Sequence, residues 1–204
     1  MIPLEGWIGE KIAFPVVVSG PSGVGKTSLV DILLAGDPDS VRSISATTRT
    51  IRENEVDGRD YFYVGKERFL HMKEAGELVE SAVYVAEQYG TPKSFLEERI
   101  AEGKSVILNI EVQGGLQVRS YDPASVLIFV IPPSWEELRR RLMNRGTETA
   151  ESIEERIRRG REELTFIPFY DYVVINDTLD RCAGDMAAII RSERRRRSRI
   201  QPRA

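Results

Sequence analysis

One motif in the sequence has residue types and spacing suited to holding phosphate. It reads GPSGVGKT and fits the pattern G-x-x-x-x-G-K-[ST]. Glycines let backbone N–H groups turn toward phosphate oxygens, and a helix that follows directs its positive end at the same anion. The lysine of such a loop reaches the β- and γ-phosphates, and the hydroxyl that follows can ligate Mg²⁺. The residues predicted to hold phosphate are Gly20, Pro21, Ser22, Gly23, Val24, Gly25, Lys26 and Thr27, with Thr27 as the metal ligand.

The flanking sequence favours a phosphate site over the alternative, a glycine-rich turn without a ligand. An apolar, β-branched run precedes the motif at Phe14–Ser19, and a helical pattern follows at Ser28–Leu34. This is the strand–loop–helix context that the motif requires. The loop alone does not name a reaction, because motors, GTPases, transport ATPases and small-molecule kinases all use it.

A second cluster of polar residues is suited to a second phosphate group. Arg49 and Arg52 lie three residues apart, and Tyr61 follows. Arginine binds phosphate oxygens with two parallel hydrogen bonds, and a tyrosine hydroxyl can donate another. Spacing alone leaves surface charge on a loop as an equal alternative.

The remaining pattern predicts the elements that position these residues. Three further apolar runs, at Ser105–Ile110, Val126–Ile131 and Tyr172–Ile175, read as buried strands, with helical stretches between them. Such strands indicate a parallel sheet covered on both faces, so the fold class is α/β. We also predict helices over Glu151–Leu164 and Leu179–Arg197, a helix opened by a capping box at Ser134 and Glu137, and a helix end at Gly103. The segment Ser43–Val64 is polar and weakly periodic, and reads as a ligand-handling lobe.

Length and composition narrow the class of protein. The chain has 204 residues, of which 41% are hydrophobic and 30% charged, as in a globular domain. One cysteine and one histidine exclude an internal disulfide and metal sites rich in cysteine or histidine. No apolar run is long enough to span a membrane, and no secretion signal is visible, so we expect a cytoplasmic protein without a membrane partner.

The C-terminus carries seven arginines and one glutamate in residues 191–204. The favoured interpretation is a solvated helix end with cations at its negative pole. Binding of nucleic acid or anionic lipid is the less favoured alternative.

Several motifs in order, from about Pro15 to Arg197, give the chain a resemblance to the guanylate kinases. These P-loop enzymes phosphorylate GMP with ATP. The resemblance implies a central parallel sheet flanked by helices, an inserted GMP-binding lobe and a small lid. It implies a single domain with its core in residues 1–42, 100–140 and 162–204, the GMP-binding lobe at 43–99 and the lid at 141–161. Arg49, Arg52, Tyr61 and Tyr89 would bind the GMP phosphate.

By the same resemblance, the residues that read the guanine base are Ser45, Glu80, Thr91 and Glu111. A carboxylate such as Glu80 accepts from both guanine N1–H and N2–H₂, whereas adenine presents an acceptor there. A site built in this way rejects the wrong base because its buried polar groups stay unpaired. Asn109 departs from the family, which has an acidic residue at this position, and this leaves its part in placing Mg²⁺ open.

The lid region matches the family at Arg141, Arg145 and Arg156, whose guanidinium groups would close over the transferring phosphoryl group. Asn176 matches the adenine contact, with a turn-forming role as a close alternative.

The resemblance implies ATP-dependent phosphorylation of GMP, and of dGMP, with Mg²⁺ accompanying ATP. A GMP phosphate oxygen attacks the γ-phosphorus in line, while Lys26, Arg49, Arg141, Arg145 and Arg156 stabilise the developing charge. Two alternatives stay open: a non-catalytic module of this fold that holds phosphopeptides, and a kinase of another small phosphorylated substrate.

Overall fold

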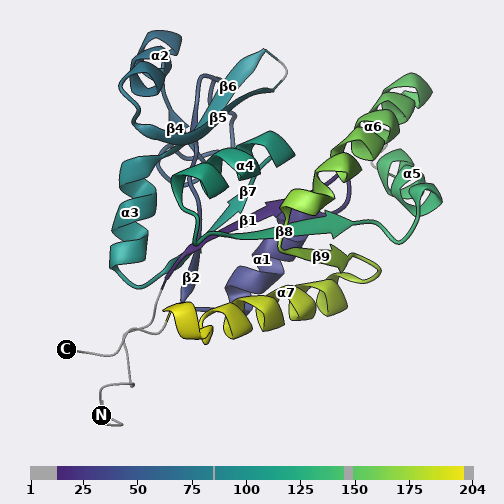
Figure 1. The fold of residues 1–204 in the computed structure, drawn as a ribbon. Coiled ribbons are helices and arrows are strands. Elements are labelled where there is room, and N and C mark those ends of the chain that lie inside the picture. Colours follow the sequence, from purple (N-terminus) through teal and green to yellow (C-terminus); the bar gives the residue numbers. More distant parts are fainter. Residues whose placement is uncertain (1–12, 85, 145–148, 200–204) are drawn as a thin grey trace, which may run out of the picture.

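The computed structural model describes residues 13–84, 86–144 and 149–199. It contains a five-stranded sheet, a separate four-stranded sheet, and helices around both (Figure 1). The strands of the larger sheet are β1 (Pro15–Ser19), β2 (Ser40–Arg42), β7 (Ser105–Asn109), β8 (Val126–Ile131) and β9 (Tyr172–Ile175). The strands of the smaller sheet are β3 (Ala46–Thr47), β4 (Phe62–Tyr63), β5 (Leu78–Tyr84) and β6 (Glu87–Pro92).

The larger sheet is entirely parallel, in the order β2-β7-β1-β8-β9. The expected α/β class with a central parallel sheet is therefore confirmed. The predicted strand at Val126–Ile131 and the one at Tyr172–Ile175 agree with β8 and β9, and the other two differ by one residue at one end. Their continuous apolar character follows from burial on both faces.

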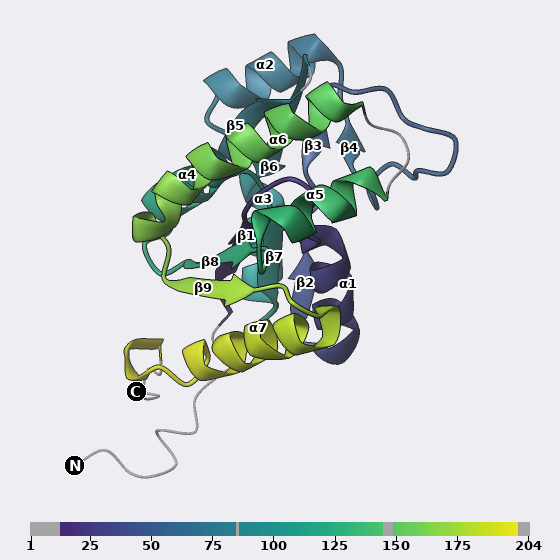
Figure 2. The ribbon, with the colours of Figure 1, turned by 90° about the vertical axis from the view of Figure 1, so that its right-hand side faces the viewer.

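Helices cover the two faces of this sheet because strand side chains alternate. Val16 and Val18 of β1 pack toward α1 (Lys26–Gly36) and α7 (Leu179–Glu193). Val17 points to the opposite face, which is covered by α3 (Lys93–Ala101) and α4 (Val112–Tyr121). The turned view shows α7 lying across α1 at one side of the sheet (Figure 2).

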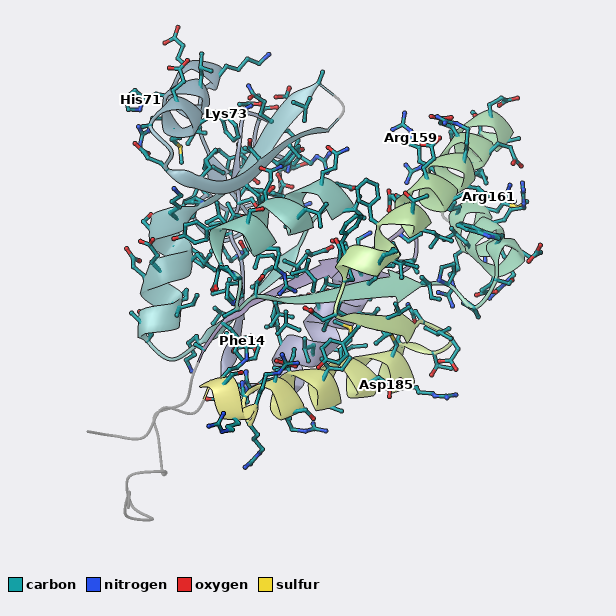
Figure 3. The ribbon with its side chains drawn as sticks, viewed as in Figure 1. Phe14, His71, Lys73, Arg159, Arg161 and Asp185 are labelled. Carbon is teal, nitrogen blue, oxygen red and sulfur yellow. The ribbon has the colours of Figure 1, made fainter. Side chains whose placement is uncertain are left out.

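The smaller sheet, in the order β4-β3-β6-β5, carries α2 (Lys66–Glu74) on its outer side. Phe69 and Met72 of α2 pack against Ala46 of β3. This lobe contains the polar, weakly periodic segment Ser43–Val64, in which β3 and β4 are strands of only two residues each. The histidine, His71, is exposed on α2 (Figure 3).

A helical hairpin projects from the larger sheet, as does the lobe that contains the smaller sheet (Figure 1). It consists of α5 (Trp135–Met143) and α6 (Ala150–Glu163), which pack through their own apolar faces. The 3₁₀-helix η2 (Leu164–Phe169) leads from α6 back to β9. Ser134 caps α5 by accepting from the backbone N–H of Glu137 at 3.1 Å, as predicted. The carboxylate of Glu137 instead accepts hydrogen bonds from Arg140 and Arg141, which bind it more strongly than a backbone amide would.

Helix ends show where tertiary contacts override sequence pattern. Gly103, with φ of +76°, follows α3 and ends it as predicted. The sequence pattern predicts a last helix that reaches Arg197, but α7 ends at Glu193. The chain then turns so that Arg199, in the 3₁₀-helix η3 (Arg197–Arg199), returns to pair with the buried Glu193 carboxylate at 3.2 Å. The guanidinium group of Arg199 also lies 4.0 Å from the ring centroid of Phe14.

Candidate active site

The phosphate loop joins β1 to α1, as the motif requires. Gly20 has φ of +138°, and a Cβ there would lie 2.1 Å from the Val130 carbonyl oxygen. Gly25 precedes α1 with φ of +102°, and a Cβ there would lie 2.7 Å from the amide nitrogen of Asn176. Any side chain at either position would therefore force the backbone of the loop to shift.

Lys26 and Thr27 occupy the first turn of α1. The ammonium group of Lys26 folds back over the loop and donates to the carbonyl oxygens of Gly20 at 2.5 Å and Pro21 at 3.2 Å. Thr27 is exposed, and its hydroxyl oxygen accepts from the side-chain amide of Asn109 at 3.2 Å. The first turn of α1 thus presents one cation and one oxygen ligand beside the loop.

A cavity of about 310 Å³, here called the smaller cavity, brings together most of the residues predicted to bind the second phosphate and the base. It is lined by Ser45, Arg49, Arg52, Tyr61, Glu80, Tyr89 and Glu111, together with Glu55, Ala82, Asn109 and Ile110. The remaining predicted residue, Thr91, is buried behind Glu80 on the neighbouring strand. The cavity has the size of a small-ligand site.

Arg49 is fixed within this cavity by a carboxylate and two aromatic rings. Its guanidinium group donates to Glu55 at 2.7 Å and lies 5.3 Å and 5.7 Å from the ring centroids of Tyr61 and Tyr63. Glu55 also accepts from the Tyr63 hydroxyl at 2.7 Å and from the backbone N–H of Arg52 at 2.9 Å. The hydrogen bond from Arg49 is the main reason that the pKa of Glu55 falls to about 2. Glu55 therefore stays ionised and orients the arginine.

Glu80 lies in β5 with only 4% of its surface exposed. Its Oε1 atom accepts from the hydroxyl of Thr91 at 2.8 Å, across the β5–β6 pair. Burial raises the pKa of Glu80, and the hydrogen bonds from Thr91 oppose that rise. A buried carboxyl group with one donor in place is prepared to accept further N–H groups from a ligand.

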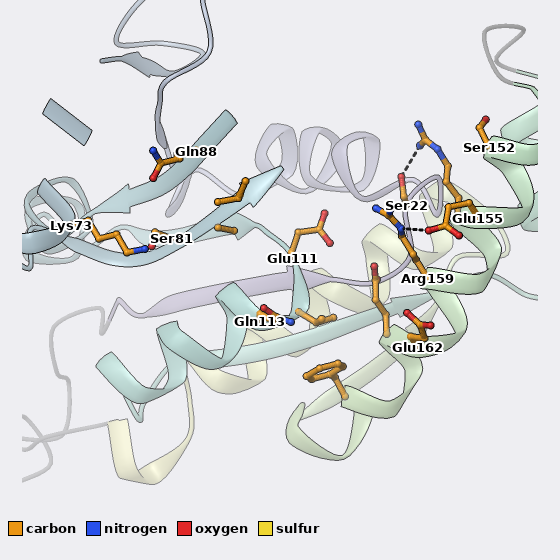
Figure 4. Close-up of a pocket in the computed structure, with 16 residues that line it drawn as sticks. Ser22, Lys73, Ser81, Gln88, Glu111, Gln113, Ser152, Glu155, Arg159 and Glu162 are labelled. Carbon is orange, nitrogen blue, oxygen red and sulfur yellow. Dashed lines mark hydrogen bonds and ion pairs between the residues drawn. The ribbon is translucent and has the colours of Figure 1, made fainter. Parts of the chain in front are cut away.

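A larger cavity of about 890 Å³ separates the lobe from α6 (Figure 4). Glu111 and Ala82 line this larger cavity and the smaller one, so the two are continuous. Arg156 reaches from α6 to the phosphate loop, where it donates to the hydroxyl of Ser22 at 2.8 Å. Arg141 in α5 instead donates to the Asn176 carbonyl oxygen at 2.9 Å and to that of Val24 at 3.4 Å. Arg145 lies outside the described residues.

Asn176 follows β9 and is 1% exposed. Its amide nitrogen donates to the Val24 carbonyl oxygen at 2.7 Å, which ties the loop after β9 to the phosphate loop. Its Oδ1 atom is buried without a hydrogen-bond partner in the described part of the chain. The predicted adenine contact therefore stays a prediction.

Comparison with known proteins agrees with this geometry. The family profile of the guanylate kinases matches residues 13–193. The guanylate kinase of Oceanobacillus iheyensis is 45% identical over 184 residues, which are 90% of this chain and 89% of that protein. The guanylate kinase of Bacillus subtilis is 42% identical over 189 residues, 92% and 93% of the two chains. The chain belongs to the guanylate kinase family.

A solved structure supports the same assignment. The crystal structure of guanylate kinase from Anaplasma phagocytophilum superposes with a TM-score of 0.75 at 30% identity, covering 94% of this chain and 92% of that one. The guanylate kinase fold therefore extends over the sheet, the lobe and the helical hairpin described above. In the described ranges, no helix combines the length and apolar character needed to cross a membrane.

Sequence reasoning missed two residues of this guanylate kinase site. Glu55 and Tyr63 do not match a phosphate-binding pattern, because they act on Arg49 and not on a ligand. The alternation in Tyr61-Phe62-Tyr63 was a usable signal, since residues two apart share a face of a strand.

Proposed function

We propose that this guanylate kinase transfers the γ-phosphoryl group of ATP to GMP, and to dGMP, giving GDP or dGDP and ADP. One observation carries the proposal: the guanidinium cluster and the buried carboxyl group of Glu80 line the same cavity. That cavity opens through Glu111 into the larger one, which is bounded by the phosphate loop residue Ser22. A monophosphate held in the smaller cavity would therefore face a triphosphate on the loop.

The acceptor side is suited to guanine. Glu80 accepts from N1–H and N2–H₂ of the base, while Thr91 holds the carboxylate and Ser45 donates toward O6. Glu111 completes the base contacts, and Arg49, Arg52, Tyr61 and Tyr89 bind the phosphate. We assign residues 43–99 to this lobe. Adenine would place an acceptor against Glu80 and leave its buried oxygen unpaired, which costs about 1–3 kcal/mol.

The donor side supplies charge stabilisation and no general base. The attacking phosphate oxygen is already anionic near neutral pH, so positioning and electrostatics do the work. Lys26 would leave the loop carbonyl oxygens for the phosphates, while Arg49, Arg141, Arg145 and Arg156 surround the transferred group. We assign the lid to residues 141–161, the adenine contact to Asn176 and the remaining residues to the core.

The residues at the loop fit a magnesium ion bound together with a triphosphate. Mg²⁺ is usually held by one or two protein oxygens, by substrate phosphates and by water. The exposed Thr27 hydroxyl is such an oxygen, and Asn109 orients it. Among the described residues no group of three His, Cys, Asp or Glu side chains could hold a metal by itself. The ion would neutralise charge on the β- and γ-phosphate oxygens.

A coupled assay with GMP, dGMP, AMP and UMP as acceptors tests this function. We expect turnover with GMP and dGMP, and we expect Lys26→Ala to lose this turnover while keeping its fold.

Glu80→Gln should raise the KM for GMP by about 10–100-fold and reduce the preference for GMP over AMP, because glutamine offers one acceptor and a repelling amide. The control variant Glu74→Gln removes an exposed carboxylate from α2 and should change neither the KM for GMP nor the preference for GMP over AMP. Binding of a phosphopeptide without any GDP formation would favour the non-catalytic alternative.

A further inference from the structure

One partly buried carboxyl group beside the phosphate loop has no part in the mechanism above. Glu163 is the last residue of α6, at the point where the lid hairpin joins η2 and the core. It lines the larger cavity, yet its Oε2 atom is buried and has no hydrogen-bond partner among the described residues. A buried, unpaired carboxylate oxygen costs stability, so its position needs an explanation.

The end of α6 is packed directly against the phosphate loop. A Cβ on Gly160 would lie 3.1 Å from the Cβ of Pro21, so the backbone of α6 at Gly160 packs against the ring of Pro21. Arg156, two turns before Glu163 on the same helix, donates to Ser22 of the loop. The placement of Glu163 and the placement of Arg156 beside the phosphate loop therefore depend on the same packing.

Three charged or titratable groups from other elements act on Glu163. They are Glu111, at the start of α4, Lys26, at the start of α1, and Tyr170, between η2 and β9. On α6 itself, Glu155, Arg156, Arg159 and Glu162 line the same cavity. Glu155 pairs with Arg159 at 2.8 Å, and Glu162 pairs with Arg158. Glu163 has no such ion pair in the described structure to hold it ionised.

The balance of these effects favours the neutral acid. Burial and the negative charge of Glu111 raise the pKa of Glu163 to about 7, although Lys26 opposes the rise. Phosphate groups entering the cavity add negative charge and attract Lys26, so both changes disfavour a second carboxylate still further. A neutral carboxylic acid also gains an O–H donor that an ionised one lacks.

We propose that Glu163 is a positioning residue of the phosphoryl-transfer site that acts as a neutral acid: protonated in the nucleotide-filled cavity, it lets the end of α6 and Arg156 settle against the phosphate loop. The ionised form opposes this arrangement by repulsion from the bound phosphates and Glu111. One proton is taken from solvent as the nucleotides bind and is returned when they leave, and none passes to the reacting phosphoryl group. This inference rests on the proposed function.

The state of Glu163 in the free protein can be measured without any activity. In carbon-detected NMR of ¹³C-labelled protein, we expect the Glu163 carboxyl signal to titrate near pH 7. Glu111→Gln should lower that midpoint, because it removes the repelling charge. Glu155, on the same helix, serves as the internal control, because hydrogen bonds from Arg158 and Arg159 lower its pKa to about 2. A Glu163 midpoint at the ordinary carboxylate value would overturn the inference, whatever the activity of the protein.

Binding and kinetics test the consequence. In calorimetry at about pH 8, with GMP and a non-hydrolysable ATP analogue in two buffers of different ionisation enthalpy, the wild type should bind as much as about one proton more than Glu163→Gln. Because glutamine mimics the neutral acid, Glu163→Gln should keep kcat within about threefold of the wild type at neutral pH. We expect kcat of the wild type to decline as pH rises toward about 10, and we expect Glu163→Gln to lack this decline.

The remaining variants distinguish a failure of the inference about Glu163 from a failure of the proposed function. Glu163→Ala should lower kcat across the whole pH range, and Glu162→Gln should behave as the wild type. A collapse of kcat in Glu163→Gln would show that the ionised carboxylate is needed. Equal proton uptake by the wild type and Glu163→Gln would show that Glu163 is not the group that takes up the proton. Either result would overturn the inference. Absence of GDP formation by the wild type, with the NMR midpoint still near 7, would instead refute the proposed function.

Discussion

At the scale of single residues, the site depends on side chains that hold other side chains. Arg49 is the main example, since Glu55, Tyr61 and Tyr63 fix its guanidinium group before any ligand is present. Fixing an arginine in advance removes part of the rotamer entropy that would otherwise be lost on binding. The hydrogen bond from Arg49 to Glu55 also raises the pKa of Arg49, so the group is a permanent cation.

We predict that Glu55→Gln weakens GMP binding by about tenfold and also lowers kcat by a smaller factor, because Arg49 binds the GMP phosphate and stabilises the transferred group. The substituted glutamine would keep the size of the side chain but would lose the charge that orients Arg49. The KM for GMP, measured at saturating ATP, checks this. Glu53→Gln alters an exposed carboxylate two residues away and should have no effect. A fall in kcat with constant KM would mean that Glu55 acts on the transition state.

The sequence indicates the residues that would meet the ligands but not those that position them. Lys26 stands in a motif whose spacing follows from phosphate chemistry, whereas the roles of Arg49 and Glu80 were predicted from the resemblance to the guanylate kinases. Glu55 was visible beside the arginines, but nothing in the pattern gives it a role. Glu163 looks like any glutamate of an amphipathic helix, because the burial of its Oε2 atom comes with the packing of α6 against a loop more than a hundred residues away in the chain.

At the scale of elements, a charged contact attaches the last helix to the end of the first. Arg194, directly after α7, donates to both oxygens of Asp37 at 3.0 and 2.9 Å and to the hydroxyl of Ser40. Burial alone would raise the pKa of Asp37, but the hydrogen bonds from Arg194 and Ser40 outweigh it and the pKa falls below 3.8. The sequence showed both helices but not this contact, which joins residues 157 positions apart.

We predict that Asp37→Asn lowers the free energy of unfolding by about 1–2 kcal/mol at neutral pH. Because the pKa of Asp37 is lower in the folded state than in the unfolded state, this stabilisation is present above the unfolded value. It is lost as pH falls through the folded value. The free energies of unfolding of the wild type and of Asp37→Asn, measured in urea, should therefore become equal at the acidic end of the pH range. Asp185→Asn, on the exposed side of α7, is the control. A difference that persists unchanged in acid would point to a packing effect.

At the scale of the whole molecule, the lobe and the helical hairpin are two projections from one sheet. The phosphate loop lies at the carboxyl end of β1, and Glu111 follows β7. Since β1 and β7 are parallel neighbours, their ends bring the phosphate loop and the smaller cavity, which Glu111 lines, to the same edge. The four apolar runs predicted the parallel sheet, whereas the position of the helical hairpin depends on long-range contacts such as Arg156 to Ser22.

The two ends of the described chain are held together by the arginine-rich segment, and this gives the last prediction. Arg199 stacks over Phe14, pairs with the buried Glu193 and donates to the Ala124 carbonyl oxygen at 2.6 Å. Arg194 and Arg196 are also engaged in ion pairs, so at least half of the arginines in Arg194–Arg199 serve the fold.

We predict that Arg199→Met destabilises the protein by about 3 kcal/mol, because the Glu193 carboxylate is left buried with one partner fewer. Adding Glu193→Gln should recover part of that loss, since the uncompensated charge is then removed. Arg197→Met, at an exposed position on the same turn, should change the free energy of unfolding in urea by less than about 0.5 kcal/mol. Equal effects of Arg199→Met and Arg197→Met would show that the segment contributes only general positive charge, and the contact with Phe14 and Glu193 would then have no energetic consequence.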